Sequence, residues 1–184
     1  MGNKVIRILL TCYPDKVSKF MRGLGRWQYS HASINTDETG PEFYSFTGKK
    51  GFVVENFVLH PTYKGQAVYC AYYEIPVPDH VCHKISLGIR EHLRNKAEYR
   101  YSMFCAAMIY LRWHVNIHRK NTCTGFVSDM LKKGEFLPEK FCRKLVSPED
   151  FLKHLRDFKC YEGDLATLTK TVLGLNEVKL LPGE

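Results

Sequence analysis

Three short segments decide the fold of this chain: QYSHASIN at residues 28–35, EFYSFT at residues 42–47 and FVVENFV at residues 52–58. Each segment is rich in aromatic or β-branched residues, which favour strands. Residues 36–41 and 48–51 separate the segments and contain the turn formers Gly and Pro. Because such short connections join antiparallel neighbours, the sequence predicts an antiparallel meander.

Further strands and helices are predicted on both sides of the meander. The apolar segments 4–11 and 67–77 have the composition of buried strands. Helices are expected at about 15–24, 79–98 and 123–133, and another begins at the capping sequence Ser147-Pro148-Glu149-Asp150. We therefore expect an α+β fold, a small antiparallel sheet packed against helices, in one domain that comprises residues 1–184.

Composition limits the class of protein. Hydrophobic residues make up 45% of the 184 positions and charged residues 25%, which excludes a disordered or fibrous chain. The seven cysteines are odd in number and scattered, as in proteins with reduced thiols. No secretion signal or membrane span is recognisable, so a cytoplasmic location is expected.

One cysteine stands where a helix is expected to begin. Cys123 follows Asn121 and Thr122, either of which can cap the helix. The unpaired N–H groups and the dipole of a helix start favour an anion and therefore lower the pKa of a thiol. Most free cysteines are small buried hydrophobes, but this position makes Cys123 a candidate nucleophile.

A cysteine nucleophile needs a base, and His31 is the best-placed histidine. Strand alternation puts His31 on one face of its segment, with Ala32 and Ile34 on the other. On the next segment Ser45 is a candidate to hold the imidazole, with Glu42 as the alternative. A structural histidine is the competing interpretation of His31.

These motifs, together with FYSF at 43–46, NTCTGFV at 121–127 and SPEDF at 147–151, resemble the circularly permuted NlpC/papain-like superfamily. The nearest branch is that of the YiiX-like cysteine peptidases and amidases, and lecithin:retinol acyltransferase-like proteins are more distant. In this superfamily the histidine strand precedes the cysteine helix, as His31 precedes Cys123 here. The family often has His or an acid at the third position, where this chain offers Ser45.

The resemblance implies a cysteine hydrolase or acyltransferase without a cofactor. Cys123 would attack the carbonyl of an amide or ester, and His31 would move the proton. The Cys123 N–H would form one arm of an oxyanion hole, and Tyr29 and Thr122 are candidates to line the site. A peptide, an amide and a lipid acyl group all remain open as substrates.

Two features of the chain suggest functions other than catalysis. A zinc site is not expected: His80, Cys82 and His83 cluster, and His114 and His118 are four residues apart, but the chain has no Cys-x2-Cys or H-E-x-x-H pattern. Residues 84–120 contain eight Lys or Arg and two Glu around the apolar segment 101–113.

The apolar segment 101–113 is more simply a core helix with basic ends, but with its flanking cations it also suits peripheral contact with an anionic membrane. No nucleic-acid motif accompanies the formal charge of +8, so no nucleic-acid partner is expected. The alternative function is a catalytically idle papain-like domain that binds such a membrane or a protein partner, and the oligomeric state stays open.

Overall fold

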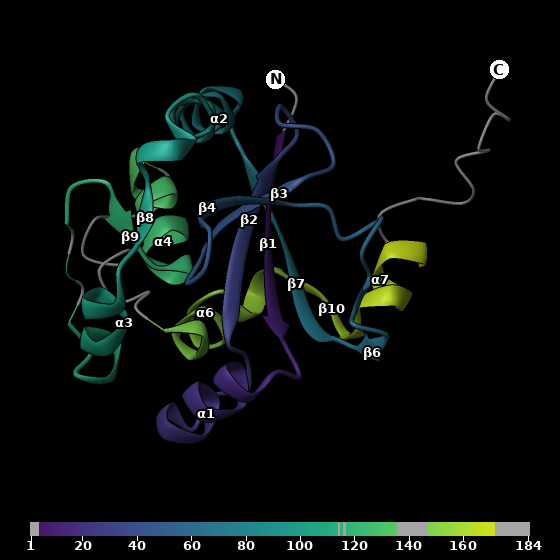
Figure 1. Cartoon of the computed structure of the whole chain (residues 1–184). Coiled ribbons are helices and arrows are strands. Elements are labelled where there is room, and N and C mark those ends of the chain that lie inside the picture. The colour runs from purple at the N-terminus through teal and green to yellow at the C-terminus, as the bar shows by residue number, and fades with distance from the viewer. Residues whose placement is uncertain (1–3, 114, 116, 136–146, 172–184) are drawn as a thin grey trace, which may run out of the picture.

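The computed structural model of the chain describes residues 4–113, 115, 117–135 and 147–171 (Figure 1). Its main sheet has the strand order β10-β7-β1-β2-β3-β4, and every neighbouring pair is antiparallel. The strands are β1 (Lys4–Cys12), β2 (His31–Thr36), β3 (Phe43–Thr47), β4 (Gly51–Glu55), β7 (Tyr69–Val77) and β10 (Lys159–Asp164). The predicted meander is therefore present as the consecutive strands β2, β3 and β4.

Two pairs of very short strands lie outside this sheet. The strands β5 (Thr62–Tyr63) and β6 (Gln66–Ala67) are antiparallel, whereas β8 (Arg100–Tyr101) and β9 (Lys120–Asn121) are parallel. The second pair stands directly before two helices of the structure. It therefore fixes where both of those helices begin.

Helices cover the sheet and extend beyond it. They are α1 (Lys16–Gly25), α2 (Asp79–Arg94), α3 (Met103–Tyr110), α4 (Cys123–Lys133), α6 (Pro148–His154) and α7 (Leu165–Thr171), with the 3-10 turns η1 (Lys96–Glu98) and η2 (Arg156–Phe158). Side-chain caps start several of them: Asp15 accepts N–H bonds at α1, Ser102 at α3 and Thr122 at α4. The helix α6 begins with the predicted capping box of Ser147 and Asp150.

The core has two parts, one on each face of the sheet. Alternate residues of the strands, such as Ile8, Ala32 and Ile34, pack with α2, α4 and α6. The strand residues on the opposite face, which include Leu9 and Phe43, pack with α7 and the loops around it. The period of two along each strand thus decides which side chains meet the helix layer.

The α+β class and the antiparallel sheet packed against helices are confirmed, but several boundaries differ from expectation. The first segment of the meander becomes a strand only at His31, three residues later than predicted. The strand β10 was not predicted, because its sequence KCYEGD has no apolar alternation and its pairing with β7 is irregular near Lys159. No helix in the described part of the chain is both long and apolar enough to cross a bilayer.

Candidate active site

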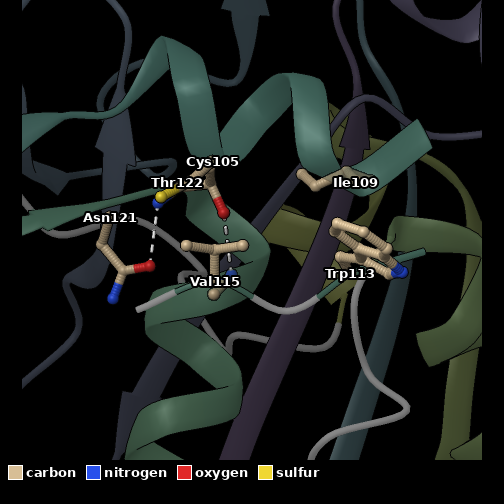
Figure 2. Close-up of a pocket in the computed structure, with 7 residues that line it drawn as sticks. Cys105, Ile109, Trp113, Val115, Asn121 and Thr122 are labelled. Carbon is tan, nitrogen blue, oxygen red and sulfur yellow. Dashed lines mark hydrogen bonds between the residues drawn. The ribbon is translucent and has the colours of Figure 1, made fainter. Parts of the chain in front are cut away.

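The start of α4 is held by a small set of polar bonds, and Figure 2 shows those among Asn121, Thr122 and Gly125. The Thr122 hydroxyl accepts the N–H of Gly125 at 3.1 Å, and the side-chain oxygen Oδ1 of Asn121 accepts the N–H of Thr122 at 2.9 Å. The Asn121 amide also donates to Asp129, which is eight residues further along the chain, at 2.8 Å. These bonds satisfy N–H groups that a helix start otherwise leaves open, and they fix the position of the next residue, Cys123.

Gly125 is required by this arrangement. A Cβ added at Gly125 would lie 2.2 Å from the side-chain oxygen Oδ1 of Asn121 and 3.0 Å from the Thr122 hydroxyl. The first distance is shorter than real Cβ atoms tolerate, and the second lies at that limit. The glycine therefore allows the two capping side chains to fold over the helix start.

Cys123 is the first helical residue of α4, and its thiol meets His31 of β2. The two side chains share a hydrogen bond, and the sulfur also accepts from the backbone N–H groups of Ala32 and Thr124. Both residues are buried, with 7% of Cys123 and 6% of His31 exposed. The structure therefore brings together the two residues that the sequence singled out as nucleophile and base.

The local electrostatics favour a thiolate beside an imidazolium. Burial by itself raises the pKa of Cys123, but the His31 hydrogen bond, the His31 charge and the two backbone N–H groups outweigh it and lower that pKa. Burial likewise works to lower the pKa of His31, yet the charge of Glu55 and the hydrogen bond with Cys123 raise it to about 10. The protonated ring and the ionised sulfur stabilise each other.

Glu55, at the end of β4, supplies the third side chain of the site. Its two carboxylate oxygens each lie 3.0 Å from His31 Nε2. With Nε2 bound to Glu55, the other ring nitrogen is the one available to the Cys123 sulfur. The result is a Cys-His-Glu constellation in which each group orients the next.

Ser45 and Glu42 do not take the place that the sequence suggested for them. The Ser45 hydroxyl is fully buried and donates to the Ala32 carbonyl, and it makes no hydrogen bond to His31. Glu42 contributes its backbone carbonyl to the Asn35 amide, again away from the ring. The predicted role of Ser45 as the residue that holds His31 is therefore wrong, because its hydroxyl reaches the adjacent backbone rather than the imidazole.

A signal for Glu55 was present in the sequence. In the β3–β4 pairing Ser45 lies opposite Val53 and Phe43 lies opposite Glu55. Residues opposite one another in an antiparallel pair share a face, so Glu55 is on the Ser45 side of the sheet. An acid on that face at the end of the third strand, with a longer side chain than serine, was the overlooked candidate.

The two expected lining residues have different outcomes. The Tyr29 hydroxyl donates to Glu162 at 2.9 Å, and its ring belongs to the core on the helix side of the sheet. Tyr29 precedes β2, so strand alternation does not put it on the His31 face. Thr122 does lie at the site, but its hydroxyl is used as the cap of α4.

One further tyrosine contacts the constellation, and the charges of the site reach a second. The Tyr13 ring lies 5.7 Å from the His31 ring, between centroids, and burial followed by the charge of Glu55 raises the pKa of Tyr13. Burial followed by the charge of Cys123 raises the pKa of Tyr101. Both phenols therefore stay protonated at neutral pH, and Tyr13 packs against the site as a neutral group.

A small pocket lies behind the start of α4, lined by Cys105, Ile109, Trp113, Val115, Asn121, Thr122 and Gly125 (Figure 2). It adjoins the capping residues rather than the Cys123 sulfur. Of the histidines considered as zinc ligands, His83 binds Glu38 at 3.1 Å, and His114 lies outside the described residues. Within the described ranges, no group of three or more His, Cys, Asp or Glu side chains is arranged to hold a metal ion.

Comparisons of the chain with protein-family models, with curated proteins and with solved structures found no match. The resemblance to permuted papain-like proteins therefore rests on the motifs alone.

Proposed function

We propose that this protein is a cysteine hydrolase or acyltransferase that acts on an amide or ester bond. The observation that carries the proposal is the contact of Cys123, at a helix start, with a His31 ring whose Nε2 is held by both oxygens of Glu55. A buried imidazole held in this way keeps the thiol ionised and oriented. The order of His31 before Cys123 in the chain supports a permuted papain-like enzyme.

The proposed reaction has two stages. The Cys123 thiolate attacks the carbonyl carbon, and the negative charge that develops on the oxygen faces the Cys123 N–H, which has no acceptor within its own helix. The carbon–nitrogen or carbon–oxygen bond then breaks, and protonated His31 gives its proton to the leaving amine or alcohol. The acyl group is left on sulfur as a thioester.

The second stage releases the acyl group. Water or another nucleophile attacks the thioester carbon, and neutral His31 takes its proton. The carbon–sulfur bond breaks, Cys123 leaves as the thiolate, and His31 is again the imidazolium. Glu55 keeps the ring oriented through both stages and stabilises its charged form. Peptides, amides and lipid esters all fit this chemistry.

Replacing the nucleophile tests the proposal. Cys123→Ala should abolish turnover of an activated acyl ester, while circular dichroism and the melting temperature stay close to those of the wild type. Cys105→Ala is the matched control, because Cys105 is also buried and also lies in the first turn of a helix. Full turnover by Cys123→Ala would overturn the mechanism.

A catalytically idle domain that serves as a binding module is the second candidate function. The small exposed fractions of Cys123 and His31 favour it, since a substrate must displace covering side chains to reach the sulfur. The comparison of Cys123→Ala with Cys105→Ala decides between the enzyme and the idle domain. An idle domain would show no turnover that depends on Cys123 with any acyl ester or amide.

A further inference from the structure

The helix α1 is amphipathic, yet it buries no residue. Its apolar residues Val17, Phe20 and Leu24 recur at helical spacing and form one stripe. These three side chains are 71%, 68% and 60% exposed. A surface helix normally uses such a stripe to pack on the core, so the exposed stripe of α1 needs another partner.

A second apolar surface adjoins the stripe. The helix α3 carries no charged residue, and Met103 and Phe104 at its start are 72% and 57% exposed. Leu111 and Trp113, directly after α3, are 59% and 65% exposed. The sequence alone favoured a core helix here, but only one side of α3 faces the core.

The two helices are in direct contact, and both lie on the lower left of the molecule in Figure 1. The Tyr110 hydroxyl of α3 lies 3.2 Å from the Met21 carbonyl oxygen of α1. The Tyr110 ring also stacks on Trp27, just after α1, with 4.9 Å between centroids. The exposed side chains of α1 and α3 therefore belong to adjoining elements and form what we call the α1–α3 surface.

The charge around this surface is positive. Lys16, Lys19, Arg22 and Arg26 lie in or next to α1, and no Asp or Glu occurs from Lys16 to Trp27. Of these cations, Lys16, Lys19 and Arg26 are exposed. By contrast, the basic segment that the sequence singled out, residues 84–120, is partly neutralised by acids inside and outside it, as in the pairs Lys84–Glu135, Arg112–Asp150 and Arg119–Glu98.

We propose that the α1–α3 surface docks on an anionic lipid bilayer. An apolar stripe with cations beside it fits the boundary between acyl chains and negatively charged headgroups. Tryptophan is enriched at that boundary, where the exposed Trp113 would lie. The arrangement is a peripheral contact, and it does not depend on the reaction of Cys123.

The test is vesicle sedimentation of the full chain with phosphatidylcholine alone and with added phosphatidylserine. The Cys123→Ala protein is a suitable background, because it removes acyl chemistry from the assay. Binding should need the anionic lipid and should weaken strongly at high salt, since exposed charges are screened there. Equal binding to both vesicles, or no binding to either, would overturn the proposal.

Paired variants separate the two contributions. Phe20→Ser with Leu24→Ser should weaken binding at least tenfold, whereas Leu59→Ser with Leu87→Ser, exposed side chains on other elements, should leave it unchanged. Equal losses in the two apolar pairs would contradict the assignment of the surface.

The cations are tested in the same way. Lys16→Gln with Lys19→Gln should weaken binding by about fivefold for each charge removed. The control with the same change in net charge is Lys49→Gln with Lys50→Gln, two exposed lysines in the β3–β4 turn. An equal loss in both pairs would mean that net charge alone drives binding, which contradicts docking through α1.

A second copy of the chain is the other occupant that this test detects. Sedimentation velocity should show a monomer whose size does not change in Phe20→Ser with Leu24→Ser. A dimer that this pair of substitutions dissociates would show that the surface is covered by self-association, and the membrane proposal would then fail.

Discussion

Replacing Glu55 by Gln should change the pH dependence of the candidate active site in a defined direction. The substitution keeps an oxygen that can accept a hydrogen bond from His31 Nε2 but removes the negative charge. At 3.0 Å and an effective dielectric constant of about 20, two unit charges attract by about 5 kcal/mol. Because part of this offsets the cost of burying the imidazolium, the net effect on the pKa of His31 should be roughly 1 to 3 units.

The sign follows from the direction of each pKa shift. In the wild type, the reactive pair forms as pH rises past the lowered pKa of Cys123 and is lost as pH rises past about 10, where His31 deprotonates. Without the Glu55 charge the pKa of His31 falls, so the alkaline limb of kcat/KM should move towards neutrality. The imidazolium then stabilises the thiolate less well, so the acid limb should move to higher pH. The bell-shaped pH profile of kcat/KM should therefore become narrower.

The assay is kcat/KM for an activated acyl ester across the pH range, with Glu42→Gln as the matched control. A fall of about 1 to 3 units in the pKa of His31 should move the alkaline limb of Glu55→Gln by the same number of pH units. Glu42→Gln should behave as the wild type, because its side chain does not meet the ring. An unmoved alkaline limb in Glu55→Gln, or an equal shift in Glu42→Gln, would refute the proposed role of Glu55.

The remaining predictions concern reactivity and the helix start. A limiting amount of iodoacetamide at about pH 6.5 should label Cys123 ahead of the other cysteines, which peptide mapping would show. Uniform labelling of the cysteines would indicate that Cys123 is an inert thiol. Thr122→Ala should reduce the free energy of unfolding by about 1 kcal/mol in urea melts, since it removes the cap of α4, and an unchanged midpoint would contradict the capping role. Ser45→Ala should leave the pH profile of kcat/KM unshifted, whereas a shifted alkaline limb would restore Ser45 as the group that holds His31.

Local sequence rules were enough for the parts of the fold that depend on near neighbours. Turn residues and aromatic segments predicted the meander, and alternation put Ala32 and Ile34 on the face that packs with the helices. The helix of Cys123 was predicted with its observed limits, because Thr122 caps its start and Gly134 follows its end. Each of these features is encoded within a few residues.

Features that depend on distant contacts were not predictable in the same way. Alternation assigns a side chain to a face but does not say how far it reaches across that face, which is why Ser45 was chosen and Glu55 was missed. The helix α1 was expected from Asp15 at its start and from Gly23 and Gly25 at its end, but these residues do not show that Phe20 and Leu24 stay exposed. Tyr29 was misplaced because β2 begins only at His31.

The most direct test of the central claim is to trap the acyl-enzyme. The protein is mixed with an excess of an activated acetyl ester and quenched in acid within the first turnover, and the position of the acyl group is mapped by mass spectrometry. The proposed mechanism predicts one acetyl group, on Cys123, which is absent in Cys123→Ala and accumulates more slowly in Glu55→Gln. Acetylation that maps to another residue, or none on Cys123 while ester is consumed, would contradict it.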